Sequence, residues 1–113
     1  MARDLERRGM RVLARNVRVA QVRGELDLIA LDGARLVFVE VKALRASSVA
    51  GPERPALAVG PRKRRKLRSL ALAWLRERDG SLPAHTALRF DVVGLRLDAA
   101  GRPTEWEHIR AAF

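Results

Sequence analysis

Hydrophobic and polar residues alternate most regularly along residues 24–42, which read GELDLIALDGARLVFVEVK. Strict alternation predicts β-strands that present one kind of side chain to each face. Asp32-Gly33, in the middle of the stretch, is a favoured dipeptide for the two-residue turn of a hairpin. The stretch therefore predicts two antiparallel strands joined at Asp32-Gly33.

The register of this predicted hairpin gathers charged residues at its open end. With Asp32 and Gly33 as the loop, Glu25 faces Glu40 and Asp27 faces Phe38. One face then carries the charged side chains Glu25, Asp27, Glu40 and Lys42. The other face is apolar and consists of Leu26, Leu28, Ala30, Val37, Val39 and Val41. We expect an acidic cluster beside an otherwise buried hairpin.

Such a cluster needs a counter-charge, because carboxylates that face each other on a ladder destabilise it and do not both stay ionised. Mg²⁺ would supply the charge, since it favours one or two carboxylates together with water and phosphate oxygens. Lys42 is one of three lysines among 23 basic residues, and lysine, unlike arginine, has a pKa that can shift. The alternative is a solvated strand end at which Lys42 and Arg23 pair with Glu25 and Glu40.

Two helices and three further strands are expected around the hairpin. The helices are expected over residues 2–8, ended by Gly9, and from Pro61 to Asp79-Gly80; the strands are expected over residues 10–16, 88–97 and 104–109. Residues 43–61 show no period, so we expect a long loop that is either a lid over the acidic cluster or a disordered insertion. Asp91 is expected to pair with Arg89 or Arg96. His85 and His108 show no metal-ligand spacing.

The helix that begins at Pro61 combines an apolar stripe, in which Trp74 is expected to be a core residue, with a basic first turn. The basic residues are Arg62, Lys63, Arg64, Arg65 and Lys66. Cations oppose the dipole at a helix N-terminus, whereas the free N–H groups there attract an anion such as a DNA phosphate. Lys63 is in line with Leu67, so we expect it to lean toward the acidic cluster. The alternative is a solvated basic turn.

Composition limits the class of protein and its partners. The chain has 113 residues, no cysteine and a net charge of +10, which predicts one domain over residues 1–113 without disulfides, thiolate metal sites or a cysteine nucleophile. The charged start MARDLERRGM and the absence of a long apolar stretch argue against a signal peptide and a membrane span, so we expect a cytoplasmic protein. The positive charge favours nucleic acid as partner; a merely soluble or a ribosome-associated basic protein is the alternative.

The spacing of the charged residues resembles a nuclease motif. Asp27, twelve intervening residues and Glu40-Val41-Lys42 resemble the PD-(D/E)xK motif of restriction endonucleases and Holliday junction resolvases. In that superfamily the Asp and Glu bind Mg²⁺, and the Lys orients or activates the attacking water. The resemblance implies these roles for Asp27, Glu40 and Lys42.

A closer resemblance extends over nearly the whole chain, from about Leu5 to Phe113. The segments GELDLIA, LVFVEVKALR, RFDVV and HIRAAF, with Arg62-Lys63 before a helix, are similar to the YraN-like family of small bacterial predicted endonucleases. Members usually carry a Gly-Glu pair about eleven residues before the glycine matched by Gly9, and that glutamate often completes the metal site in resolvases. This chain begins at Met1, so we expect either a start further upstream or a site with one ligand fewer.

Together these observations predict a restriction-endonuclease-like α/β domain with a mixed central sheet flanked by helices. The expected function is Mg²⁺-dependent (or Mn²⁺-dependent) cleavage of DNA, with branched, Holliday junction-like DNA among the substrates that the resemblance implies. Asp27 and Glu40 would bind the metal, and Glu25 would be an extra ligand or base. A homodimer is suggested by analogy with resolvases. The alternative function is a non-catalytic nucleic-acid-binding protein with an incomplete nuclease site.

Overall fold

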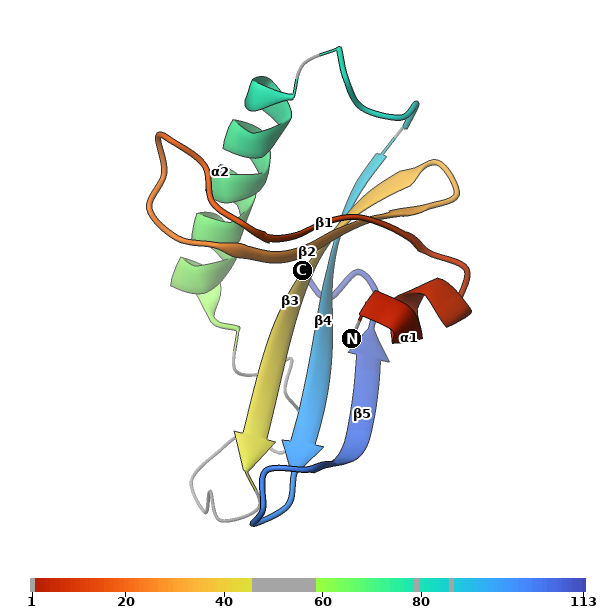
Figure 1. The fold of residues 1–113 in the computed structure, drawn as a ribbon. Coiled ribbons are helices and arrows are strands. Elements are labelled where there is room, and N and C mark those ends of the chain that lie inside the picture. The colour runs from red at the N-terminus through yellow and green to blue at the C-terminus, as the bar shows by residue number, and fades with distance from the viewer. Residues whose placement is uncertain (1, 46–58, 79, 86) are drawn as a thin grey trace.

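A single five-stranded sheet organises the molecule (Figure 1). The computed structural model describes residues 2–45, 59–78, 80–85 and 87–113. The elements in chain order are α1 (Ala2–Arg7), β1 (Arg11–Val17), β2 (Leu26–Asp32), β3 (Arg35–Arg45), α2 (Pro61–Glu77), β4 (Ala87–Leu97) and β5 (Pro103–Ile109). The strands lie in the order β1-β2-β3-β4-β5. Only β3 and β4 are parallel; the other neighbours are antiparallel. The predicted α/β fold with a mixed sheet is confirmed.

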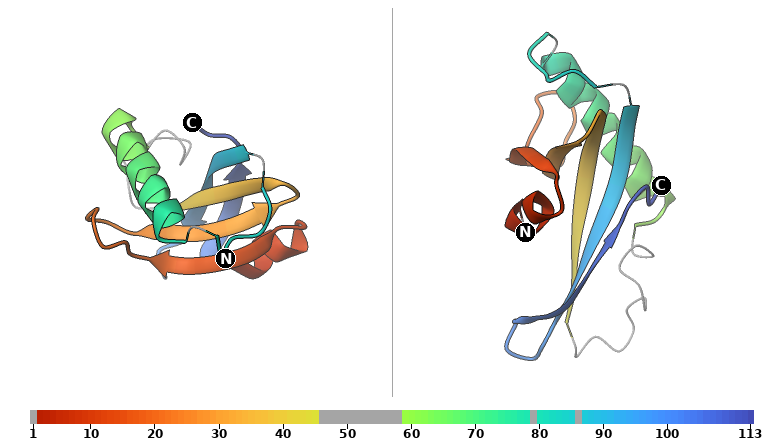
Figure 2. Two further views of the ribbon diagram at one scale, coloured as in Figure 1. Left: turned by 90° about the horizontal axis from the view of Figure 1, so that it is seen from above. Right: turned by 90° about the vertical axis from the view of Figure 1, so that its right-hand side faces the viewer.

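The parallel pair explains the position of α2, because parallel strands need a long crossover connection. α2 lies in that crossover and begins with proline in its first turn. Its buried side chains are Leu67, Leu70, Ala71, Ala73 and Trp74. Figure 2 shows α2 and α1 on opposite sides of the sheet.

Each face of the sheet has its own core. Beneath α2, the rings of Trp74, Phe38, Phe90 and Phe113 follow one another with centroids 6.1, 5.4 and 5.3 Å apart. On the other face, Leu5 of α1 packs with apolar residues of β2, β3 and β4. Trp74 is 3% exposed, which confirms it as a core residue. Leu26 packs beneath α2, not with Leu28 on the opposite face as the alternation predicts.

The hairpin of β2 and β3 has a different register from the predicted one. Leu31 pairs with Leu36 and Asp32 with Arg35, so the two-residue loop is Gly33-Ala34, and Gly33 has the positive φ of +61° that such a turn needs. Asp32 instead belongs to the ladder, where its Oδ2 lies 2.9 Å from Arg89 Nη1. Because the register shift is two residues, the side chains of the paired residues stay on their predicted faces.

Element boundaries differ from the prediction after Lys42. The alternation of charges ends there, but β3 continues to Arg45 because it stays paired with β4 as far as Leu97. The predicted loop 43–61 is therefore wrong for residues 43–45, and its centre, 46–58, with the predicted lid, lies outside the described residues. Neither helix in the described ranges is long and apolar enough to cross a membrane.

Candidate functional site

Asp27 and Glu40 come together at the open end of the hairpin. The paired part of the hairpin ends at Leu28 and Val39, and Asp27 and Glu40 are the next residue of each strand. Asp27 Oδ2 accepts a hydrogen bond of 2.8 Å from the backbone N–H of Val41, which holds its carboxylate against β3. The two acids are close enough for the charge of Asp27 to raise the pKa of Glu40, whereas the predicted register set Asp27 opposite Phe38.

Glu40 is a buried carboxylate of which one oxygen contacts lysine amines and the other has no partner among the described residues. Its side chain is 6% exposed, and Oε1 lies 3.5 Å from Lys63 Nζ and 3.7 Å from Lys42 Nζ. Oε2 is buried and has no hydrogen-bond partner among the described residues. Burial and the nearby charge of Asp27 raise the pKa of Glu40, and this outweighs the opposite effect of Lys63 and Lys42.

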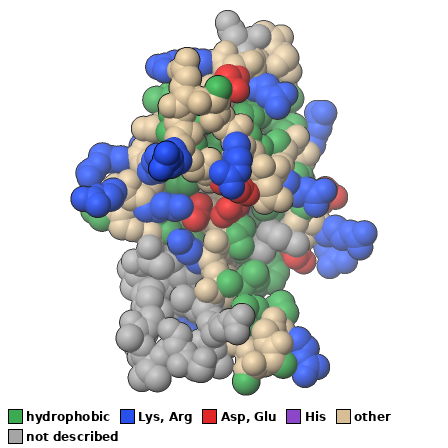
Figure 3. Space-filling model, turned by 60° about the vertical axis from the view of Figure 1, so that its left-hand side comes forward, with side chains coloured by type: hydrophobic (Ala, Val, Ile, Leu, Met, Phe, Trp, Pro, Cys, Tyr) green, Lys and Arg blue, Asp and Glu red, His purple; other side chains and the backbone are tan. Residues whose placement is uncertain are grey.

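α2 contributes Lys63 to this group, as the helical stripe predicts. Lys63 is in the first turn of α2, where the described helix has no acidic residue to offset its cations. Its amine contacts Glu40 on the face of the sheet that α2 covers. In Figure 3, which brings the left-hand side of Figure 1 forward, acidic side chains lie among surrounding Lys and Arg side chains. The site is therefore a small acidic centre within a basic face.

The other predicted phosphate-binding residues divide into two kinds. Arg62, Arg65 and Lys66 are exposed, like Lys63. Arg64 is half-buried: its Nε donates 2.8 Å to the carbonyl of Val59, and its guanidinium lies 5.4 Å from the Phe113 ring centroid. Arg64 therefore stabilises the start of α2 through these contacts, while its exposed neighbours remain accessible to an anion.

Glu25 is placed differently from Asp27 and Glu40. Its Oε2 lies 3.2 Å from Arg18, and its role as an extra ligand or base stays a prediction. Across the described residues, no group of three or more acidic, His or Cys side chains is arranged to hold a metal ion. The donors present are thus two carboxylates, one with an unpartnered buried oxygen, and this set fits Mg²⁺, which completes its shell with water and phosphate oxygens. A pocket of about 340 Å³ opens beside Asp27 on the α1 side of the sheet, where Ala2, Leu28 and Val41 also line it.

A second charged group, which sequence reasoning found only in part, lies on the other face of the sheet. Asp91 pairs with Arg89, as predicted, but its Oδ2 also lies 2.7 Å from Nε2 of the buried His108. His108 was considered only for metal-ligand spacing along the chain. The available signal was the alternation of residues 104–109, which as a neighbouring strand brings His108 beside β4.

Comparison with known proteins places the chain in a family. The family model described as "Uncharacterised protein family UPF0102" matches residues 1–95. A UPF0102 protein of Nocardia farcinica is 44% identical over 112 residues, which cover 99% of this chain and 81% of that protein. One of Acidothermus cellulolyticus is 41% identical over 119 residues, with 99% and 86% covered. One of Geobacter sulfurreducens is 44% identical over 109 residues, with 96% and 78% covered. The chain belongs to the UPF0102 family, the YraN-like family to which the sequence resemblance pointed.

Proposed function

We propose that this protein is a divalent-metal-dependent endonuclease that hydrolyses phosphodiester bonds in DNA. One observation supports it above the others: Glu40 is buried beside Asp27 with Oε2 unpartnered among the described residues, and two lysine amines lie within 4 Å of Oε1. A buried acid whose pKa is raised by burial and by a neighbouring charge is a candidate for a functional residue.

The residues of the site would divide the work between them. Asp27 and Glu40 would hold Mg²⁺ or Mn²⁺ through their free oxygens. A bound divalent cation supplies Lewis-acid polarisation of the scissile phosphate. Lys42, whose amine is next to Glu40, would orient the attacking water and stabilise the charge that develops on the phosphate. Lys63 is 43% exposed, so it can neutralise Glu40 and still reach a phosphate at the surface.

DNA would be held by the basic first turn of α2. The exposed side chains Arg62, Lys63, Arg65 and Lys66 can contact backbone phosphates without reading sequence. The net charge of +10 adds long-range attraction that weakens with salt. Branched DNA is the substrate class that we propose to test first, and a homodimer would match the two-fold symmetry of a four-way junction.

The test is cleavage of labelled duplex, flap and four-way-junction DNA with Mg²⁺, Mn²⁺ or EDTA. Asp27→Asn should reduce metal-dependent cutting by more than about 100-fold, beyond the cost of losing a residue that only supports a ligand, while DNA binding is kept. Asp98→Asn, which changes an exposed carboxylate in the turn before β5, is the matched control. Unchanged cutting by Asp27→Asn would remove the proposed site, and Glu25→Gln in the same assay tests whether Glu25 takes part.

A non-catalytic nucleic-acid-binding protein is the second candidate. It is favoured by the pairing of Glu40 with two lysines and by the absence of a third acidic ligand among the described residues. Binding with a steep salt dependence and no cutting with either metal would identify this case. Structured RNA in the same binding assay separates an RNA-associated protein from a DNA-binding one.

A further inference from the structure

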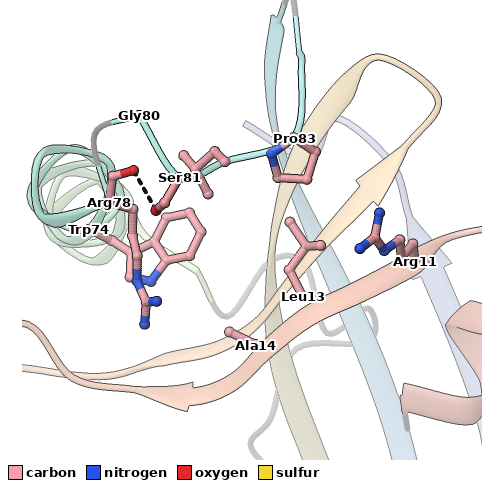
Figure 4. A pocket seen from close by; sticks show the side chains of 9 residues that line it. Arg11, Leu13, Ala14, Trp74, Arg78, Gly80, Ser81 and Pro83 are labelled. Atoms are coloured by element: carbon pink, nitrogen blue, oxygen red, sulfur yellow. Dashed lines mark hydrogen bonds between the residues drawn. The ribbon is translucent and has the colours of Figure 1, made fainter.

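A second pocket lies at the C-terminal end of α2 (Figure 4), whereas Lys63, which contacts Glu40, is in the first turn of that helix. Its volume is about 420 Å³, within the range of small-ligand sites. The walls come from three parts of the chain: β1, the last turns of α2 and the segment that leads to β4. Arg11, Leu13, Trp74, Arg78, Leu82 and Pro83 are among the lining residues.

Two guanidinium groups give this pocket a positive charge. Arg11 of β1 and Arg78 at the end of α2 are both exposed. Within the described ranges, neither has a carboxylate within ion-pair distance. Figure 4 shows Arg78 beside Trp74 and Arg11 on the other side of Leu13. A guanidinium group without an acidic partner suits a phosphate, which it can bind with two parallel N–H donors.

Trp74 adds an apolar wall and an unused donor. The ring is buried, and the Arg78 guanidinium lies 5.7 Å from its centroid. The indole Nε1 is buried and has no acceptor in the described part of the protein, an arrangement that costs free energy. A ligand oxygen drawn in by Arg78 would give this N–H an acceptor, while Leu13, Leu82 and Pro83 would contact an apolar or planar group.

We propose that this pocket binds a phosphate monoester attached to a planar ring, as in a nucleotide, either free or at the end of a nucleic-acid strand. The strand-end case rests on the proposed function. From Lys63 to Arg78 the chain advances 15 residues, or about 22 Å in a helix. At 3.4 Å per nucleotide of a duplex strand, the bound strand end would lie roughly six to seven nucleotides from the bond that is cut.

The test uses Trp74 as its own reporter. In a Trp106→Phe protein, Trp74 is the remaining tryptophan, and its fluorescence is followed in EDTA while ligand is added. The probes are deoxyadenosine 5′-monophosphate, a 5′-phosphorylated oligonucleotide and the same oligonucleotide with a 5′-hydroxyl. We expect a saturable change with a phosphorylated probe. Arg11→Gln and Arg78→Gln should each raise its Kd about tenfold, the usual size for loss of a charged hydrogen-bond partner.

Arg76→Gln is the matched control, because it removes the same charge from an exposed position of α2 that does not line the pocket. It should change the Kd by less than about twofold. Binding of the phosphorylated strand alone assigns the site to strand ends, and binding of the mononucleotide as well assigns it to nucleotides in general. Three results would each overturn the proposal: equal binding of the 5′-hydroxyl strand, an equal loss in Arg76→Gln, or no saturable change with any probe. Since EDTA prevents cutting, failure of the nuclease proposal leaves this result readable.

Discussion

Glu40 of β3 and Asp91 of β4 are two buried carboxylates on neighbouring strands whose pKa values shift in opposite directions. Asp91 pairs with Val39, and Glu40 with Val92, so their side chains lie on opposite faces of the sheet. Their exposed fractions are 6% and 0%. Burial acts on both acids in the same direction, so the difference between them comes from their partners.

Asp91 is saturated with hydrogen bonds. Its Oδ1 accepts from Arg89 Nε and the N–H of Ala111, at 2.8 and 3.0 Å, and its Oδ2 lies 2.9 Å from Arg89 Nη2 and 2.7 Å from His108 Nε2. Burial alone would raise the pKa of Asp91, but these bonds hold it below its ordinary value. Glu40 has two more distant amines on one oxygen and, among described residues, none on the other. A carboxylate whose oxygens all have hydrogen-bond partners stabilises the fold, whereas one with an unpartnered oxygen is available to a ligand.

The largest expected effect is on stability. Asp91→Asn removes the charge that compensates Arg89 on this buried face, and loss of one partner of a buried pair costs about 3–5 kcal/mol. Urea unfolding measures this cost. Asp98→Asn, in an exposed turn, should cost less than about 1 kcal/mol. Equal costs for the two variants would contradict a structural role for Asp91.

Glu40→Gln should have the reverse profile. The substitution removes a carboxyl group whose pKa is raised by burial and by Asp27. The folded state is then no longer destabilised by an ionised buried acid at neutral pH. We expect the free energy of unfolding to rise by about 0.5–2 kcal/mol, as for other functional residues that are replaced. DNA cutting should fall by more than about 100-fold. A variant that is less stable than the parent protein and still cuts DNA would show that Glu40, like Asp91, has a structural role.

Lys63→Met should have an intermediate effect that separates binding from chemistry. The variant removes a cation 3.5 Å from Glu40 and, under the proposed function, one contact with a DNA phosphate. The slope of log K against log salt concentration for DNA binding should therefore become shallower by about one unit. Lys66→Met removes an exposed lysine of the same turn for which no ion pair with Glu40 is described. Both variants should weaken binding equally, and only Lys63→Met should reduce the cutting rate at saturating DNA. Equal cutting rates in the two variants would mean that Lys63 contributes to DNA binding and not to the chemical step.

The smallest effect is the pH dependence that Asp91 contributes. Since its pKa is lowered in the folded state, its stabilising contribution is complete above the ordinary value of 3.8 and is lost as the pH falls below it. The free energy of unfolding should therefore decline toward acid in the parent protein. In Asp91→Asn the decline should be shallower when urea midpoints are compared between neutral and acid pH. A slope that is the same in both proteins would mean that other acids dominate.

The sequence predicted the elements and their faces well because both depend on short-range periodicity. The apolar stripe of α2 predicted that Trp74 is buried and that Lys63 leans toward the acids, and both are confirmed. The alternation in the hairpin predicted that Asp27 and Glu40 share a face.

The periodicity of the sequence could not predict the register of the hairpin or the partners of Asp32 and Asp91. A shift of two residues preserves each face, so alternation could not tell a loop at Asp32-Gly33 from one at Gly33-Ala34. In the observed register Asp32 lies in the ladder and forms an ion pair with Arg89, a residue 57 positions away that the local pattern does not reveal. His108 was missed as a partner of Asp91 for the same reason, because it lies on a strand that is distant in the sequence.

The mixed sheet also implies an order of assembly. The β2–β3 ladder closes over two residues, from Asp32 to Arg35, whereas pairing of β3 with β4 joins Arg35 to Ala87 across the whole crossover. Short loops close at a lower entropic cost, and long-range parallel pairing is intrinsically slow. The hairpin that carries both acids therefore forms from local contacts, while α2 brings Lys63 to Glu40 from across the crossover. We therefore expect that the two carboxylates come together beside Lys42 first during folding, and that docking of α2 adds the Lys63 amine later.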